Sequence, residues 1–504
     1  MVWKTAIPFL LLGLVFRIYL IQLFPQGFDI DESLILYWAK KTFLEGQFYA
    51  YSPATEGTGW EMIPGYIYYF FLSIFKTSPR YLAIFFGLSE VVLLGMFCRK
   101  LISKEAGWIA ATFLMLTPWH IYYSGIVGTC TGVIGVVLFC EILLMVRGWT
   151  LKLISLPLSL GLLYYATFRL FFLKTIFFEF KNKKTAFSLV GAFLLTLMIV
   201  GVSQSEVKDF LTRGNYNYLN PNLNIFKNYF FSLIFPFFPI FESYSQTTDF
   251  FMADYVHVGL SKALAGIPPV TYVFLPIMGL ILFGYKKNKM KPVKKSIGFL
   301  FFCWLCLGFM GPSLSRMLIV LPYLIIVGVF SLMDLKLRYS NKVFIVILIF
   351  LFSVMGVSDW FFLKNFNQNN QLESVFHSRF FKIEKLISSH EIVKEGEQAY
   401  LVADYGFQVV QYVQTLNNSF VALPPAPAEV IVDDLKSRFD GSAQYVFFDR
   451  VPKDASDLSG YDKLERVQAI ERALLRESNV LEMRPVFDER LKEIGHYLKI
   501  SGFN

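Results

Sequence analysis

The chain has 504 residues, of which 55% are hydrophobic, 18% are aromatic and only 17% are charged. Because soluble domains carry about 25% charged residues, this composition excludes a mainly soluble protein and favours lipid as the solvent. The formal net charge is +9, but the basic residues gather between apolar stretches, which indicates membrane topology and argues against nucleic-acid binding.

Apolar stretches that could cross a bilayer recur along the first two-thirds of the chain. A span needs about 17–25 apolar residues, and about eleven segments meet or approach this length: 5–23, 81–98, 107–123, 131–146, 153–168, 170–180, 185–203, 270–285, 296–313, 317–335 and 342–363. The shorter segment 63–75 is rich in Tyr and Phe, which is typical of an interfacial helix. Basic residues follow every second span, so the positive-inside rule predicts a cytoplasmic N-terminus.

This topology predicts two domains. A transmembrane domain covers 1–364, with large outer loops at 24–80 and 204–269, and 365–504 then lies outside the cytoplasm. In that last part, short strands alternate with helices, which indicates a small α/β domain. The strands are expected at 399–404, 419–423 and 444–449, and the helices at 429–439 and 461–478. No phosphate-binding loop or catalytic triad is evident there, which favours a docking or substrate-positioning role.

The first outer loop opens with an acidic cluster, "FDIDES" (28–33), which contains Asp29, Asp31 and Glu32. The stretch that follows, 31–46, has apolar residues at helical spacing and is expected to lie along the membrane surface. The acids could cap this helix, since carboxylates favour helix N-termini. Capping explains one acid better than three. The alternative is a general base at the membrane interface.

Cations are predicted on the same outer side. Arg17 lies one to two turns from the end of the first span, Arg169 lies between two short spans, and Arg316 begins the tenth span. Each could anchor its helix by snorkelling. Together with the acidic cluster they instead indicate a lipid-linked phosphate, since guanidinium groups bind phosphate through two parallel hydrogen bonds. His257, in the loop 204–269, and Tyr123 are further candidates for contact with the substrate or its phosphate.

Four stretches carry a family resemblance: "FRIYL" (16–20), "DIDES" (29–33), the segment 78–125, and "SRMLIVLPYLIIV" (315–327). In order and spacing they resemble the integral-membrane glycosyltransferases of the GT-C class, in the branch of protein mannosyltransferases and aminoarabinose transferases (glycosyltransferase family 39-like). Two basic positions of that family are replaced, because Gly125 follows Ser124 and because Met62 and Ile63 precede Pro64.

The resemblance implies a multi-pass helical membrane protein of GT-C architecture in the plasma membrane. It implies inverting transfer of a hexose or pentose from a polyprenyl-phosphate donor to a protein, lipid or glycan acceptor, with Asp31 as general base beside Glu32. No cofactor is required by the pattern. A divalent cation, if bound, would be held by Asp29 and Asp31.

Two other functions stay open: a flippase or transporter for a lipid-linked sugar, and a non-catalytic subunit of a cell-envelope glycan assembly system. Transporters usually show internal repeats and charges near the midplane. In this sequence no repeat is evident and the charges gather at one face, which favours the transferase.

Overall fold

The computed structural model describes residues 2–24, 27–28, 30–52, 61–128, 132–145, 154–165, 168–179, 183–203, 294–310, 318–367, 378–402, 407–423, 426–449, 461–487 and 493–503. The chain divides into two compact units. The first comprises Met1–Leu23 and Trp38–Asn369, and the second comprises Phe24–Tyr37 and Asn370–Asn504. One division falls inside helix α2 (Ile30–Glu45), so the acidic segment groups with the C-terminal part of the chain.

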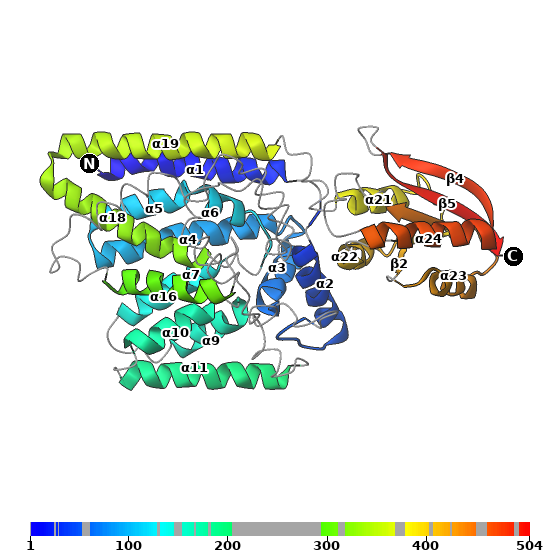
Figure 1. The fold of residues 1–504 in the computed structure, drawn as a ribbon, viewed down its shortest axis with the longest axis horizontal. Coiled ribbons are helices and arrows are strands. Elements are labelled where there is room, and N and C mark those ends of the chain that lie inside the picture. The colour runs from blue at the N-terminus through cyan, green and yellow to red at the C-terminus, as the bar shows by residue number, and fades with distance from the viewer. Residues whose placement is uncertain are drawn as a thin grey trace. The chain divides into compact units, whose positions relative to one another are not determined.

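The first unit is a helical bundle, with its long helices side by side (Figure 1). Its helices are α1 (Val2–Leu23), α3 (Met62–Phe75), α4 (Arg80–Leu101), α5 (Lys104–Met115), α6 (Pro118–Tyr123), α7 (Val133–Met145), α9 (Ser155–Tyr164), α10 (Phe168–Glu179), α11 (Lys183–Val202), α16 (Lys294–Met310), α18 (Leu321–Arg338) and α19 (Asn341–Asn367), and a 3-10 turn, η2 (Leu318–Val320), leads into α18. Every predicted span except 270–285 coincides with one or two of these elements, and 270–285 lies outside the described residues.

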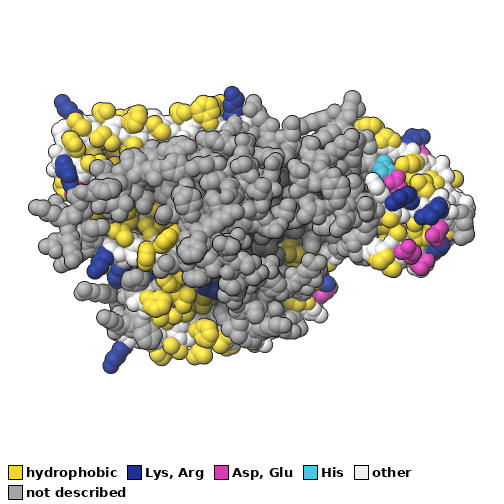
Figure 2. Space-filling model, in the orientation of Figure 1, with side chains coloured by type: hydrophobic (Ala, Val, Ile, Leu, Met, Phe, Trp, Pro, Cys, Tyr) yellow, Lys and Arg dark blue, Asp and Glu magenta, His cyan; other side chains and the backbone are white. Residues whose placement is uncertain are grey.

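Five of the described helices are long and apolar enough to cross a membrane: Val2–Leu23, Arg80–Leu101, Thr185–Val202, Leu318–Arg338 and Asn341–Lys364. Large apolar side chains point away from the bundle on several of them, such as Leu11, Phe187 and Phe350. Figure 2 shows hydrophobic side chains over much of the described surface of the bundle. Soluble proteins rarely expose so much apolar area, so this is a multi-pass membrane protein. The count of about eleven spans stays a prediction.

The segment predicted as one span at 107–123 is two helices, α5 and α6. The break comes just before Pro118, which has no backbone N–H and clashes with the carbonyl four residues earlier. Thr117 Oγ1 donates a hydrogen bond of 2.7 Å to the Phe113 carbonyl at the break. The interruption leaves the carbonyl of Met115 available to a side chain from another helix.

The second unit contains a five-stranded sheet of order β2-β1-β3-β5-β4. The strands are β1 (Gln398–Val402), β2 (Val421–Leu423), β3 (Gln444–Asp449), β4 (Ser478–Phe487) and β5 (Glu493–Phe503). β1 pairs in parallel with β2 and β3, while β5 is antiparallel to both β3 and β4. The predicted α/β domain is therefore confirmed, with β4 and β5 as strands that the sequence pattern did not predict.

Two apolar cores lie on opposite faces of this sheet. One contains Ile383 of α21 (Ser378–Ser388) and Val413 of α22 (Phe407–Asn417). The other contains Ile431 of α23 (Ala428–Ser437) and Leu474 of α24 (Tyr461–Glu477). Successive side chains of a strand point to opposite faces, so each central strand contributes to both cores.

Candidate active site

Arg17 is buried inside the bundle and joins α1 to the end of α5. Its Nη1 donates to the carbonyl of Met115 at 2.6 Å and to that of Gly13 at 3.1 Å. The side chain has no exposed surface. A cation inside a membrane helix is costly unless it is paired or used, so the carbonyl freed by the break before Pro118 is part of what allows Arg17 at this position.

His120 and Glu90 continue this arrangement across two more helices. Arg17 Nη2 lies 2.7 Å from His120 Nδ1, and His120 Nε2 lies 2.8 Å from Glu90 Oε2. Because a guanidinium can only donate, Nδ1 must accept, so the hydrogen of the neutral imidazole is on Nε2 and points to Glu90. The second carboxylate oxygen of Glu90 accepts a bond of 3.0 Å from the Gly135 backbone N–H. This Arg17–His120–Glu90 chain links α1, α6, α4 and α7.

Asp359 of α19 adds a second carboxylate near Arg17. It is fully buried and lies within electrostatic range of the Arg17 guanidinium. Neither Asp359 oxygen has a hydrogen-bond partner among the described residues, and the same holds for Arg17 Nε. The guanidinium is thus flanked by two acidic side chains, Glu90 through His120 and Asp359 through space.

A second buried cluster joins α7, α10 and α18. Lys174 forms an ion pair with Glu141, and Tyr323 donates a hydrogen bond of 2.7 Å to the same Glu141 oxygen. Lys174 Nζ also lies 5.0 Å from the ring centroid of Phe171, a cation–π distance. All three polar residues are buried. This Glu141–Lys174–Tyr323 cluster ties three helices together at a place where water is scarce.

The predicted site residues are described to different extents. Glu32 lies in the first turn of α2 and is buried, and Tyr123 ends α6 with 3% of its surface exposed. Arg169 is the second residue of α10 and is partly exposed. For Asp31 only the backbone, in the first turn of α2, is described. Asp29, His257 and Arg316 lie outside the described residues.

Arg17 and Tyr123 are brought into one neighbourhood, since Arg17 bonds to His120 of the short helix that Tyr123 ends. Asp31 and Glu32 belong to the second unit, whereas Arg17, Tyr123 and Arg169 belong to the first. The catalytic and phosphate-binding roles assigned to these residues stay predictions.

Sequence reasoning missed most of the buried charges: Glu90, Glu141, Lys174 and Asp359 each lie within an otherwise apolar stretch. The signal was present, because ionisable residues inside membrane spans are rare and have partners. Arg80 was missed as well. It is buried at the start of α4, and its Nη1 donates to the Gly125 carbonyl at 3.0 Å, beside the position where the resembled family often has an arginine.

Tyr66 of α3 bonds to the end of α2 and to the start of the loop that follows it. Tyr66 OH donates to the Tyr49 carbonyl at 2.8 Å and accepts from the Tyr49 backbone N–H at 3.0 Å, and it lies 3.1 Å from Thr42 Oγ1. The segments predicted as interfacial helices, 31–46 and 63–75, are helices α2 and α3. Tyr66 therefore fixes the second half of α2 against α3.

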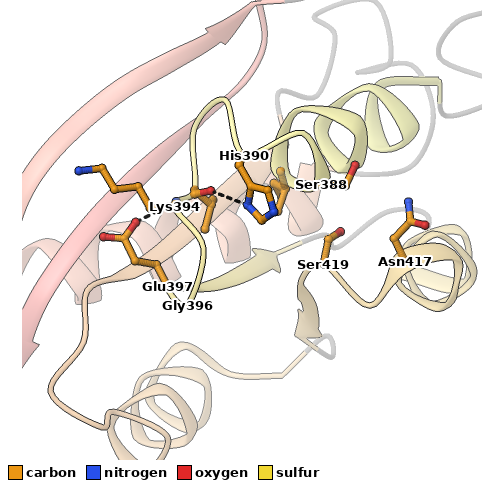
Figure 3. A pocket seen from close by; sticks show the side chains of 9 residues that line it. Ser388, His390, Lys394, Gly396, Glu397, Asn417 and Ser419 are labelled. Atoms are coloured by element: carbon orange, nitrogen blue, oxygen red, sulfur yellow. Dashed lines mark hydrogen bonds between the residues drawn. The ribbon is translucent and has the colours of Figure 1, made fainter.

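A polar pocket of about 500 Å³ lies in the second unit (Figure 3). It is lined by Ile387, Ser388, His390, Val393, Lys394, Gly396, Glu397, Asn417 and Ser419. His390 Nδ1 lies 3.3 Å from the Val393 carbonyl, and Glu397 accepts a bond of 3.0 Å from the Lys394 backbone N–H. These bonds hold the loop before β1 in place, and the pocket offers no paired nucleophile and base.

Comparison with known proteins gives similarity only at the level of structure. No protein-family model matches the sequence, and no curated protein is similar to it. ArnT from Cupriavidus metallidurans bound to undecaprenyl phosphate superimposes with a TM-score of 0.55, over 98% of this chain and 97% of that chain, at 12% identity, and its apo state gives the same values. The apo oligosaccharyltransferase of Archaeoglobus fulgidus gives 0.51 over 89% of this chain and 69% of that chain, at 9% identity.

These similarities concern the fold, because identities of 9–12% are too low to carry an activity from one chain to another. They extend over the helical bundle and the C-terminal α/β unit alike, as the coverage of ArnT shows. The chain therefore shares its overall fold with these two membrane proteins, in agreement with the GT-C architecture that the sequence resemblance predicts.

Proposed function

We propose that this protein is a glycosyltransferase that moves a sugar from a polyprenyl-phosphate donor to an acceptor at the outer face of the plasma membrane. The observation that carries the proposal is the likeness, over 98% of this chain, to ArnT bound to undecaprenyl phosphate. The buried polar chains of the bundle agree with it, since charges inside membrane helices usually serve a function.

The proposed reaction is a single displacement with inversion. The acceptor hydroxyl oxygen attacks the anomeric carbon while the bond from that carbon to the phosphate oxygen breaks. The acceptor proton passes to the carboxylate of Asp31, the general base, with Glu32 beside it. The lipid phosphate leaves as an anion, which positive side chains stabilise.

Arg17, Arg169 and Arg316 are the proposed sources of that positive charge, together with His257 and Tyr123. Arg169 is partly exposed and lies in the first turn of its helix, which suits a direct contact. Arg17 is fully buried and donates to protein groups, so we assign it an electrostatic contribution to the same site. If the reaction depends on a divalent cation, Asp29 and Asp31 are the residues proposed to bind it. Among the described residues no group of three or more His, Cys, Asp or Glu could hold one.

The test is transfer of radiolabelled sugar from polyprenyl-phosphate donors by the purified protein in membranes. Asp31→Asn keeps the size of the side chain and removes the base, so the rate should fall at least about 100-fold. Glu45→Gln changes an exposed acid at the end of the same helix, outside the proposed site, and as the matched control should lower the rate far less. Equal rates for Asp31→Asn and the unmodified chain would overturn Asp31 as the base.

The same preparation separates the other functions. A flippase would move the labelled lipid between leaflets without an acceptor and without release of the lipid phosphate. A non-catalytic subunit would bind the donor and transfer nothing when purified. Chelation before the assay decides the metal, since a bound cation that serves the reaction makes transfer sensitive to chelator.

A further inference from the structure

Phe28 stands at the start of the acidic segment and packs against two helices of the second unit. Its ring centroid lies 5.8 Å from that of Phe381 on α21, with planes at 65°, and 5.7 Å from that of Tyr412 on α22, with planes at 77°. Phe381 and Tyr412 are themselves 6.4 Å apart. The three rings form one aromatic cluster, and edge-to-face pairs at such distances are favourable.

This cluster joins the segment to the second unit, in agreement with the way the chain divides. Residues Phe24–Tyr37 group with Asn370–Asn504, although more than 300 residues separate them along the chain. Leu23 before the segment and Trp38 after it both belong to the bundle. The segment is thus a piece of the second unit that is covalently joined to the bundle at both ends.

Phe28 is close in sequence to the acids that it would position. Asp31 follows it by three residues, and α2 begins at Ile30, so only one residue lies between the ring and the helix that carries Asp31 and Glu32. Phe28 packs against a well-ordered surface. Tyr412 is only 2% exposed, and α21 and α22 cover one face of the sheet around a shared apolar core. Movement of Phe28 would therefore move the start of α2.

We propose that the C-terminal part of the second unit, Asn370–Asn504, positions the acidic segment through Phe28. Phe28 is then a positioning residue for the acids at the start of α2. The inference rests on the proposed function for its consequence in catalysis, but the anchoring itself does not. Without the aromatic cluster, the segment would sample other positions, and a carboxylate displaced by about 1 Å already loses much of its effect.

The anchoring is tested by hydrogen exchange on the full-length protein in lipid nanodiscs, with the peptide that covers 24–37 as the readout. Phe28→Ala removes the edge-to-face contacts and should speed exchange there about tenfold, since local opening sets the rate. Phe28→Tyr keeps the ring and should exchange like the unmodified chain.

A matched control lies on the opposite face of the same sheet. Phe439 packs edge to face on Phe503 at 5.8 Å, and Phe503 is a partly buried residue that packs against the other apolar core. Phe439→Ala removes the same kind of contact from the same unit and should leave exchange of 24–37 unchanged. Unchanged exchange in Phe28→Ala, or equal acceleration in Phe439→Ala, overturns the anchoring.

Transfer assays on the same variants test the catalytic consequence. At saturating donor, Phe28→Ala should lower kcat about tenfold and leave the KM for the lipid donor within twofold, while Phe28→Tyr restores kcat. Faster exchange with an unchanged kcat, in a chain whose Asp31→Asn variant is inactive, refutes the positioning role and leaves the proposed function intact. If the unmodified chain transfers no sugar, the proposed function fails, and the exchange experiment still decides whether Phe28 anchors the segment.

Discussion

The helical bundle contains ion pairs that are buried between helices, whereas the described ion pairs of the C-terminal α/β unit are at least partly exposed. In the bundle, Glu90, Glu141 and Lys174 are between 2% and 8% exposed, and each contacts a side chain of another helix. In the C-terminal unit, acidic and basic side chains lie together on the surface (Figure 2). One example is Asp434 of α23 with Arg438, the residue that caps the end of this helix; their side chains are 31% and 46% exposed.

The difference in burial indicates in which part of the molecule polar contacts determine the structure. A surface pair competes with water and salt, so its net contribution is about 0–1 kcal/mol. A pair inside an apolar bundle has no such alternative, and the loss of one partner leaves a charge that nothing solvates. The bundle's polar contacts therefore specify which helices pack together, whereas those of the C-terminal unit adjust stability slightly.

The largest effect is expected at the Glu141–Lys174–Tyr323 cluster. Lys174→Met leaves the Glu141 carboxylate with Tyr323 as its remaining partner in the cluster, which should lower the free energy of unfolding by about 3–5 kcal/mol. The measurement is thermal unfolding of the purified protein in detergent. The control is the double variant with Glu141→Gln, which removes both charges and should regain most of the loss. If the double variant is the less stable of the two, the buried charge is not the cause.

A smaller effect is expected in the Arg17–His120–Glu90 chain. Glu90→Gln keeps the side-chain size but replaces the charged acceptor of His120 Nε2 by a neutral one, which should cost about 1.5–3 kcal/mol. Unfolding in detergent again gives the value. Ser89→Ala is a matched control on the same helix, where its hydroxyl donates to the Phe85 carbonyl, and it should change stability by less than about 0.5 kcal/mol. Comparable losses in the two variants would contradict a special role for the buried chain.

The sequence predicted the bundle well because the signal for a membrane helix is strong and local. A long apolar stretch such as that of α19 forms a helix in lipid, because only a helix satisfies its backbone hydrogen bonds within one segment. Where prediction failed, the reason was also local. Pro118 was treated as part of a span, although its missing N–H breaks the helix and creates the site that Arg17 uses.

The C-terminal unit and the site were harder to predict. β4 has exposed side chains along most of its length and lacks a continuous apolar run, so its pairing with β5 depends on contacts that sequence periodicity does not show. The partnership of Arg17 with His120 joins residues 103 positions apart. Arg17 was recognisable as a cation in a span, but its partners follow from the packing of α1 on α5 and α6.

A pH-dependent effect of modest size is expected at Glu397 in the C-terminal unit. Burial by itself would raise the pKa of Glu397, but the Lys394 backbone N–H, Tyr445 and Lys499 outweigh it and hold the pKa below its usual value. A lowered carboxyl pKa stabilises the fold above the unfolded value of about 4.3, and this contribution is lost as pH falls through the folded value.

The matching variant is Glu397→Gln, which should lower stability by about 0.5–1 kcal/mol at pH 7 and by less at pH 3, because the contribution of the charge is lost as pH falls. Thermal unfolding of the full-length chain at the two pH values provides the comparison. Titration of Lys499 does not affect this comparison. Tyr445 and Glu397 raise the pKa of this lysine, so its contribution to stability is lost only above about pH 10.4. If the stability difference between Glu397→Gln and the unmodified chain is larger at pH 3 than at pH 7, Glu397 acts through its shape and not through its charge.

The smallest effects come from two pairs with the same residue types, of which the less exposed one also has a second hydrogen bond from the arginine. Asp334 with Arg338 at the end of α18 and Asp434 with Arg438 at the end of α23 have the same spacing of four residues. The Asp334 side chain is only 9% exposed, against 31% for Asp434. Arg438→Ala should cost about 0.3–0.5 kcal/mol and lose that effect in 1 M salt, where screening acts within about 3 Å. Arg338→Ala should cost about 1 kcal/mol and keep most of it in salt. Equal losses of stability in the two variants would mean that the exposed arginine, and not the burial of the carboxylate, determines what such a pair contributes. The contrast between bundle and surface would then hold only for charges shared between helices.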